Sequence, residues 1–531
     1  MNFHRLDRPN AIKTGVEQGP EVQWNDPSKA ITPSLRFCWA LTLIMLLGLA
    51  LRVAYIDRDY YNPDEQVARA VVQNLSFPNQ WDTNWVLSVT EPYWRYDQYN
   101  FSSYHYLLYC WKRLISLVGV DWVNHIGALR ALNGLLGLVL IAAIARATRQ
   151  LIGEIAGISA AVAAAILPLL VQDAHYLRCE AMLTAGVATQ LCFSLRSNPV
   201  PRWLLLAAGL IMGWMMASKA TMGLALPLLL PLLFAAADEA QVSWKKYLGP
   251  SCLLGLGCIL GFAIGVPFGV FQPQKYLSGL AQLAAEYRMP MPPYTSQDMA
   301  PSYPMALAYM TGILGWGFLA VTGLGILHVF RLTGWRRAGL LMLPVVAALV
   351  VFGGHPLFTE RSYSPFLPIM LVCFGAGIQF ISEVDIRQFA VLHNLRPVLL
   401  VILLFCTLAP PVIYSWQIVF QGFSGREQIE KDAALERMKG PLGGKTMVLI
   451  GARFSNENCR SIENLVRKKD AILIVIIDYY DTITPACLAI LQGPFHARIL
   501  GHRESLFPDL PPCSLHTFIS PRLWLLYLPA K

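Results

Sequence analysis

The chain has 531 residues, of which 55% are hydrophobic and only 14% are charged, and its mean hydropathy is +0.45. A soluble globular protein of this length carries about a quarter charged residues, so the composition excludes an ordinary soluble enzyme. The net charge is +9. The cations are spread over short segments between apolar runs, which does not favour a nucleic-acid partner.

Apolar runs of about 20 residues recur from residue 36 to residue 416, as in polytopic helical membrane proteins. The run at 104–118 carries Lys112 and Arg113 in its middle, so we expect an interfacial helix there rather than a span. The sequence predicts eleven spans, at about 36–56, 124–145, 153–173, 179–195, 203–218, 220–237, 249–270, 304–330, 338–354, 362–382 and 397–416.

The positions of the cations predict the orientation in the membrane. With a cytoplasmic N-terminal segment, 1–35, the inside loops contain most of the paired cations, such as Arg146 with Arg149 and Lys245 with Lys246. This orientation places a long first loop, 57–122, on the outer face. We expect a multi-pass protein of a bacterial inner membrane, with a spanning core at 36–416.

Residues 417–531 differ in character from the spans. Short β-like runs are separated by Pro, Gly and polar turns, which predicts a small α/β domain outside the cytoplasm. The runs lie at 446–450, 472–477, 497–500, 515–519 and 523–528. This segment contains no catalytic motif, so a packing or acceptor-presenting role is favoured.

Two adjacent acids stand out in the first outer loop. Asn62 and Pro63 interrupt the chain, and Asp64 and Glu65 then fall in the first turn of an expected helix, where the helix dipole favours acids. Taken alone, the two acids could serve only as helix caps. Their side chains diverge by about 100° on a helix, so they cannot share one role.

Further polar residues fall at span ends on the same predicted outer face, and together they predict a functional cleft there. Each has a plain alternative: Lys219 could snorkel, Glu180 could be a helix-terminus acid, and Arg361 could be a flanking cation. No Cys or His spacing indicates a metal, although a divalent ion is left open, and no cofactor is indicated. The set comprises Asp173, His175, Arg178, Glu180, Lys219, Arg288, Arg361 and Tyr363.

Carboxylates, cations and aromatic rings at an outer membrane boundary suit sugar transfer from a lipid-linked phosphate. The cations would hold the phosphate, the aromatic side chains would stack on the sugar, and one carboxylate would deprotonate an acceptor hydroxyl. The acceptor would be a glycan, lipid or protein. A transporter or lipid flippase is the main alternative, and a non-catalytic membrane subunit is a third. Transporters tend to place ionisable groups near the membrane midplane rather than at span ends.

The order of these motifs resembles the GT-C superfamily of integral-membrane glycosyltransferases, in particular the branch that is similar to protein mannosyltransferases and the lipid A aminoarabinose transferase. The resemblance rests on NPDEQVAR at 62–69, FSSYHYL at 101–107, HYLRCE at 175–180, SKA at 218–220 and RSYSPFLP at 361–368. It extends over about 36–416. The chain departs from the branch where Glu180 replaces a common Asp and where Ser103-Tyr104 replaces Tyr-Pro.

The residues and the resemblance together assign candidate roles. The resemblance places the catalytic acid at Asp64; Glu65 would position the acceptor or pair with Arg69, and Glu180 is the second candidate base. Lys219, Arg361 and Arg288 would hold the donor phosphate. The expected substrate-binding residues are Tyr61, Tyr104, His105, Asp173, His175, Arg178 and Tyr363.

Overall fold

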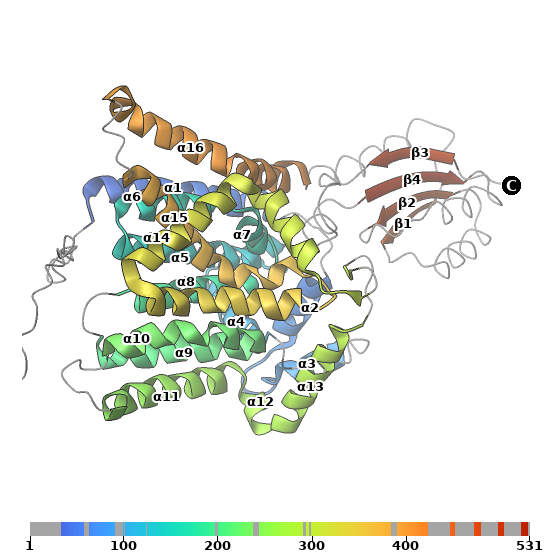
Figure 1. The fold of residues 1–531 in the computed structure, drawn as a ribbon. Helices are drawn as coiled ribbons and strands as arrows, with labels where there is room; N and C mark the ends of the chain where they lie inside the picture. The colour runs from blue at the N-terminus through green and yellow to red at the C-terminus, as the bar shows by residue number, and fades with distance from the viewer. Residues whose placement is uncertain are drawn as a thin grey trace, which may run out of the picture.

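The computed structural model describes residues 33–57, 63–90, 99, 101–123, 125–196, 200–236, 244–289, 294–296, 299–383 and 390–422, with four segments at 446–451, 472–478, 498–503 and 522–528. This part of the chain is mainly helical, and most helices lie alongside one another in a bundle (Figure 1). The α-helices are α1 (Leu35–Val53), α2 (Pro63–Asn74), α3 (Thr83–Thr90), α4 (Ser102–Leu117), α5 (Ile126–Leu151), α6 (Glu154–Ile166), α7 (Pro168–Gln172), α8 (Glu180–Ser194), α9 (Arg202–Ser218), α10 (Leu229–Ala236), α11 (Leu248–Gly265), α12 (Pro267–Phe271), α13 (Pro273–Glu286), α14 (Tyr303–Gly353), α15 (Leu367–Glu383) and α16 (Ala390–Trp416).

The helices confirm a multi-pass architecture. Within the described ranges, six helices are long and apolar enough to cross a membrane, and the bent pair Glu154–Ile166 with Pro168–His175 brings the number to seven. The helix α14 covers two predicted spans and contains non-helical backbone at Gly334 (φ 76°, ψ 160°). Helices α8, α9 and α10 are shorter than a full span. The number eleven therefore stays a prediction.

A buried arginine stabilises the break between α6 and α7. Pro168 has no N–H, so it cannot donate to the carbonyl of Ala164 four residues earlier. The Arg52 guanidinium, which is fully buried, donates to the carbonyls of Ala164 (3.0 Å) and Ala165 (2.9 Å) instead. Arg52 lies in the last turn of α1, so one side chain connects α1 to the bend.

The predicted interfacial helix is α4, and its two central cations have different surroundings. Arg113 is exposed, whereas Lys112 is buried, donates from Nζ to the carbonyl of Val72 (2.7 Å) and lies over the rings of Tyr109 and Trp122. Lys112 therefore connects α4 to α2. Because its charge is satisfied by protein groups, this cation does not have to face water.

Small residues bring α9 and α11 into backbone contact. A Cβ atom at Gly213 of α9 or at Gly261 of α11 would overlap the backbone of the facing helix. Close approach through glycine is a common way to pack membrane helices, which gain little from the hydrophobic effect. Helices α9, α10 and α11 lie side by side (Figure 1). The α9–α11 contact fixes the axis of α9, whose C-terminal end reaches the site described below.

Four strands follow the helices: β1 (Thr446–Gly451), β2 (Ile472–Asp478), β3 (Arg498–Arg503) and β4 (Arg522–Leu528). They form one sheet in the order β1-β2-β4-β3, with β1 parallel to β2 and β4 antiparallel to both of its neighbours. The strands coincide with four of the five predicted runs, and the run at 515–519 lies outside the described residues. Figure 1 shows the sheet at the same end of the helices as α2, α3 and α13. A separate domain at 417–531 stays a prediction.

The packing of α9 against α11 predicts unequal effects for two glycine substitutions on α11. Gly261→Leu should lower the midpoint of thermal denaturation of the purified protein by several degrees, because overpacking a close contact costs about 1–3 kcal/mol. Gly255→Leu is the matched control, since a Cβ there meets nothing within 4 Å. Equal midpoints for the two variants would contradict the close contact.

Candidate functional site

The first turn of α2 is attached to α5 by a buried ion pair. Arg130 of α5 donates from Nε to Glu65 Oε1 (2.7 Å) and from Nη2 to Oε2 (2.6 Å), and both side chains are almost completely buried. A third guanidinium nitrogen donates to the carbonyl of Ile56 (2.7 Å). The bidentate geometry fixes the orientation of the two side chains as well as their distance. The ion pair therefore holds the start of α2 at the end of the bundle.

This arrangement corrects one prediction and leaves another open. The partner of Glu65 is Arg130 and not Arg69, whose Nη2 donates to the carbonyl of Val123 (2.6 Å). Helix α2 begins at Pro63 as predicted, so Asp64 lies in its first turn. The side chain of Asp64 and the whole of Tyr61 lie outside the described residues. Their predicted roles stay predictions.

Asn133, one turn after Arg130, joins α5 to two other segments. Its amide nitrogen donates to the carbonyls of Asp173, Tyr176 and Arg178, and its Oδ1 accepts a hydrogen bond from the hydroxyl of Tyr104 (3.1 Å). The backbone of Leu177 also donates to Glu65 Oε1 (3.1 Å). The loop that leads to Arg178 and Glu180 is therefore held by the same side chains that hold α2 and α4.

Three charges meet at the end of this loop, and we call them the Glu180 cluster: the buried Arg178 and Glu180 and the partly exposed Lys219. Glu180 Oε2 lies 3.5 Å from Arg178 Nε, and Oε1 lies 3.5 Å from Lys219 Nζ. Glu180 begins α8, whereas Lys219 directly follows α9. One carboxylate thus faces two cations from different segments, Arg178 in the loop before α8 and Lys219 just after α9.

Lys219 is positioned by its backbone and stays charged. Helix α9 ends at Ser218, and Lys219 is extended, with φ −149° and ψ 109°. The backbone N–H of Phe101 donates to the carbonyl of Ser218 (2.9 Å), which ties this turn to the start of α4. Burial lowers the pKa of Lys219, but the attraction of Glu180 outweighs it, and the pKa lies above its usual value. The ammonium group is therefore protonated at neutral pH.

Further charges surround the Glu180 cluster. Asp173 is 6% exposed, interacts electrostatically with Glu180, Arg178 and Glu360, and its Oδ2 has no hydrogen-bond partner in the described part of the chain. Glu360 is buried at the start of a short 3-10 turn, Glu360–Ser362, and Arg361 in the same turn is partly exposed. The structure therefore gathers Asp173, Arg178, Glu180 and Lys219, and brings the turn of Arg361 beside Asp173.

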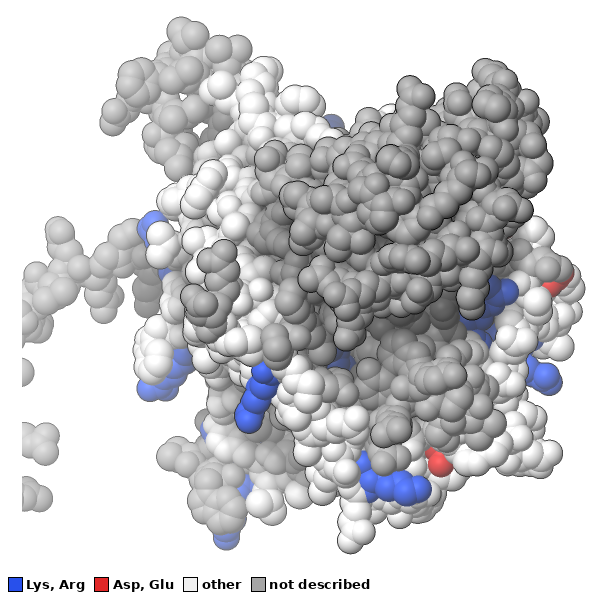
Figure 2. All heavy atoms as spheres, turned by 90° about the vertical axis from the view of Figure 1, so that its right-hand side faces the viewer, with Lys and Arg blue, Asp and Glu red and all other residues white. Residues whose placement is uncertain are grey.

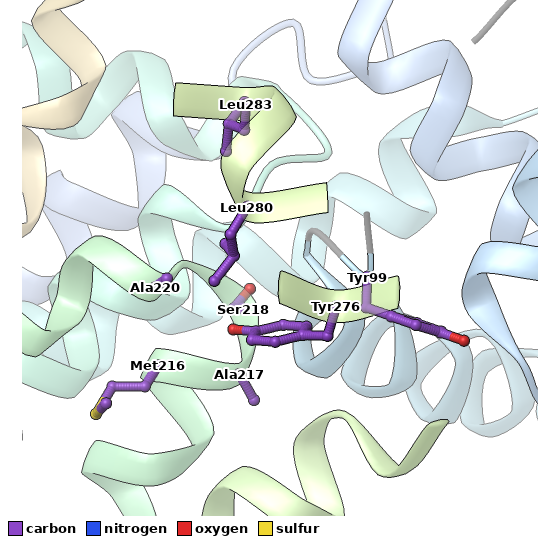
Figure 3. A pocket seen from close by; sticks show the side chains of 8 residues that line it. All are labelled: Tyr99, Met216, Ala217, Ser218, Ala220, Tyr276, Leu280 and Leu283. Atoms are coloured by element: carbon purple, nitrogen blue, oxygen red, sulfur yellow. The ribbon is translucent and has the colours of Figure 1, made fainter. Parts of the chain in front are cut away.

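A small cavity is lined by Ser218 and Ala220, the chain neighbours of Lys219, but not by Lys219 itself. It lies between the end of α9 and the helix α13, and Figure 3 shows Tyr276 and Leu280 of α13 pointing toward Ser218. The cavity measures about 10 Å³, which is about the room that one water molecule needs. The hydroxyl of Ser218 has no hydrogen-bond partner within the described residues. Polar atoms therefore border a space that is too small for a sugar.

The remaining predicted site residues have mainly structural surroundings. His175 is fully buried, with its ring nitrogens against the carbonyls of Val171 (2.9 Å) and Ala54 (3.0 Å). Burial lowers the pKa of His105 to about 4, so this imidazole is neutral at pH 7. Tyr363 packs against Phe352, with ring centroids 5.5 Å apart. Arg288 is exposed just after α13, and no described contact brings it to the Glu180 cluster.

Sequence reasoning missed the residues that hold the predicted site residues in place and those that line the cavity. Arg130 and Asn133 interrupt an apolar span, and an ionisable residue at that depth is usually paired or functional, which is a signal that could have identified Arg130. Tyr276, which lines the cavity, lies far from any motif and gives no such signal, and Tyr99, which also lines it, lies just outside the motif at 101–107. No group of three or more His, Cys, Asp or Glu that could hold a metal ion occurs within the described residues.

A family model matches part of the chain. The family described as dolichyl-phosphate-mannose-protein mannosyltransferase matches residues 119–268, a segment that includes Arg130, Asn133, the Glu180 cluster and the α9–α11 contact. The match confirms the resemblance to the mannosyltransferase-like branch of GT-C glycosyltransferases. No curated protein matches the chain in sequence.

Among solved structures, the chain is similar to ArnT from Cupriavidus metallidurans bound to undecaprenyl phosphate, with 13% identity, a TM-score of 0.49, and coverage of 92% of this chain and 97% of that chain. The apo state of that protein gives 12% identity, a TM-score of 0.48, and coverage of 93% and 98%. The archaeal oligosaccharyltransferase AglB from Archaeoglobus fulgidus, in complex with an inhibitory peptide and a dolichol-phosphate, gives 14% identity and a TM-score of 0.48 over 77% of this chain. The match spans 58% of the AglB chain.

The Glu65–Arg130 pair predicts a non-additive pair of substitutions. Arg130→Met leaves a buried carboxylate without its partner and should destabilise the protein by about 3–5 kcal/mol. Adding Glu65→Leu should restore part of that loss, because the unpaired charge is removed. Thermal denaturation of the purified variants measures both effects, with the exposed Arg113→Met as control. A double variant no more stable than Arg130→Met alone would contradict the pairing.

Proposed function

We propose that the chain is an inverting glycosyltransferase that moves a sugar from a polyprenyl-phosphate donor to an acceptor hydroxyl at the outer face of the membrane. The observation that carries this proposal is the Glu180 cluster, in which Glu180 faces a protonated Lys219 where α8 begins and α9 ends. The chain neighbours of Lys219, Ser218 and Ala220, line a small cavity. The family match over 119–268 supports an enzyme that acts on lipid-linked sugars.

The cations would bind the donor phosphate. Lys219 and Arg361 are the proposed phosphate ligands, and Glu180, which also faces Arg178, would hold the ammonium group of Lys219 in place. Arg288 is a weaker candidate, because it is exposed beyond α13. On the end of the molecule seen in Figure 2, the described Lys and Arg side chains outnumber the Asp and Glu side chains, which suits an anionic substrate.

The acceptor would be activated by Asp64. Helix α2 holds this acid in its first turn, and the contact of Leu177 with the neighbouring Glu65 connects that turn to the loop that precedes the Glu180 cluster. The carboxylate would take the proton of the acceptor hydroxyl while the hydroxyl oxygen attacks the anomeric carbon. The bond to the phosphate oxygen breaks in the same step, and the polyprenyl phosphate leaves as a stable anion without acid assistance.

The small cavity implies a movement before the reaction. A sugar ring does not fit into about 10 Å³, and the cavity wall that faces α9 is formed by α13. Helix α13 lies between Gln272 and Tyr287, and its lining side chains are Tyr276, Leu280 and Leu283. We propose that α13 moves away to admit the sugar, whose hydroxyl groups could then donate to the unpaired Oδ2 of Asp173.

A transporter is the alternative function, and the geometry favours it less. Transporters place their binding groups near the membrane midplane on broken helices. The Glu180 cluster lies instead where α8 begins and α9 ends. Arg52, which does lie at a broken helix, has its guanidinium occupied by backbone carbonyls.

Removal of the phosphate ligands should weaken use of the donor. Lys219→Ala and Arg361→Ala should each reduce affinity for a polyprenyl-phosphate sugar about tenfold, since a charge-assisted contact in a partly buried site contributes about 1.5–3 kcal/mol. Binding of the lipid to purified protein measures the effect. Lys275→Ala on α13 is the control, because that lysine is exposed at the same end. Unchanged affinity in both variants would exclude Lys219 and Arg361 from the phosphate site.

Removal of the base should abolish turnover but preserve donor binding. Asp64→Asn keeps the shape of the side chain and removes the proton acceptor, so the rate should fall by about 10²–10⁴-fold. Turnover and donor binding are measured on the same preparation. Glu180→Gln should instead weaken donor binding, because it removes the counter-ion of Lys219. If Asp64→Asn keeps near-normal turnover and Glu180→Gln does not, the two roles are reversed.

A further inference from the structure

A second cavity lies far from the Glu180 cluster, between α5, α8 and the start of α9. Its volume is about 430 Å³, within the range of small-molecule sites. The walls are largely apolar, with Val139, Ala142, Ala143, Phe193 and Leu204 among the lining residues. Arg146 and Arg196 also line it, from α5 and from the residues just after α8.

This cavity belongs to the opposite membrane boundary. Arg146 follows Arg130 by 16 residues on α5, which corresponds to about 24 Å along a helix. That distance is close to the thickness of the hydrocarbon core, about 30 Å. Arg130 lies at the end that holds the Glu180 cluster, so Arg146 and Arg196 lie near the other leaflet.

Among the described residues, no carboxylate neutralises the charges of the cavity. Neither Arg146 nor Arg196 makes an ion pair with a carboxylate in the described ranges, and the lining residues include no acid. Gln150, which also lines the cavity, has a buried Oε1 without a hydrogen-bond partner there. A hydrogen bond joins the two helices that line the cavity, because Cys192 Sγ of α8 donates to the carbonyl of Ala143 of α5 (2.9 Å).

The apolar wall is open toward the lipid. Val139 is 49% exposed and Trp203 is 65% exposed, although both line the cavity. Tryptophan is enriched at membrane interfaces, where its ring contacts both chains and headgroups. A free phosphate ion would gain nothing from these apolar walls, whereas a phospholipid would fill them with an acyl chain.

We propose that this cavity is a binding site for an anionic phospholipid of the leaflet opposite to the Glu180 cluster. The phosphate lies between the guanidinium groups of Arg146 and Arg196, and an acyl chain lies along Val139, Ala142 and Phe193. Arg146 lies in α5 and Arg196 just after α8, so a bound lipid would connect α5 to the segment that follows α8. If Arg146 and Arg196 served only to set the orientation of the helices in the membrane, the protein would show no preference for one lipid headgroup over another.

The test is binding of dioleoylphosphatidylglycerol to the full chain in detergent, measured by native mass spectrometry against dioleoylphosphatidylcholine. The wild-type protein should retain one phosphatidylglycerol and show a clear preference over phosphatidylcholine. Arg146→Gln/Arg196→Gln should weaken retention at least about tenfold, since each cation near anionic lipid contributes about 1 kcal/mol. Ala142→Trp, which fills the cavity and keeps both arginines, should cause a comparable loss.

Two controls separate this site from general charge effects and from misfolding. Arg202→Gln/Arg331→Gln removes two exposed cations that do not line the cavity and should leave retention unchanged. Arg146→Lys/Arg196→Lys should recover much of the binding, which shows that the site still folds. Equal retention of the two lipids, full retention by Arg146→Gln/Arg196→Gln or by Ala142→Trp, or displacement of the lipid by millimolar inorganic phosphate would overturn the proposal.

Discussion

The buried ion pair of Glu65 and Arg130 is the constraint on which the arrangement around the start of α2 depends. It is bidentate and almost inaccessible to water, so loss of either partner leaves a charge in a poorly polarisable environment. One turn further along α5, Asn133 binds three carbonyls of the loop that precedes α8 and the hydroxyl of Tyr104. Two residues about one turn apart on α5 therefore set the relative places of α2, α4 and the loop at 173–178.

A second set of contacts acts along the helices. Arg52 supplies the donors that Pro168 cannot provide, which allows α6 and α7 to bend immediately before Asp173. The glycine contact between α9 and α11 fixes the position of α9, which ends at Ser218, and therefore the position of Lys219. The Glu180 cluster thus forms where two anchored segments meet, and α4 links them through Phe101 and Tyr104.

The sequence predicted the helices and strands better than the contacts between them. Pro63 marked the start of α2, four strands appeared within predicted runs, and the glycosyltransferase-like motifs agreed with the family match. Glu65 was expected to use Arg69, four residues away on its own helix, because local spacing is all that a sequence displays. The true partner, Arg130, is 65 residues away and inside an apolar span. Contacts between helices, and the cavity beside Tyr276, depend on packing that no local pattern encodes.

The small cavity between Ser218 and α13 has a consequence for the rate and the affinity of donor binding. If the sugar can enter only when α13 is displaced, the measured affinity equals the intrinsic affinity multiplied by the fraction of molecules that are open. An open fraction of about 1% would raise the apparent Kd about a hundredfold. Association would then be slower than diffusion, and its rate would level off at high donor concentration. A substitution on α13 could change the dissociation constant without touching the phosphate or the sugar.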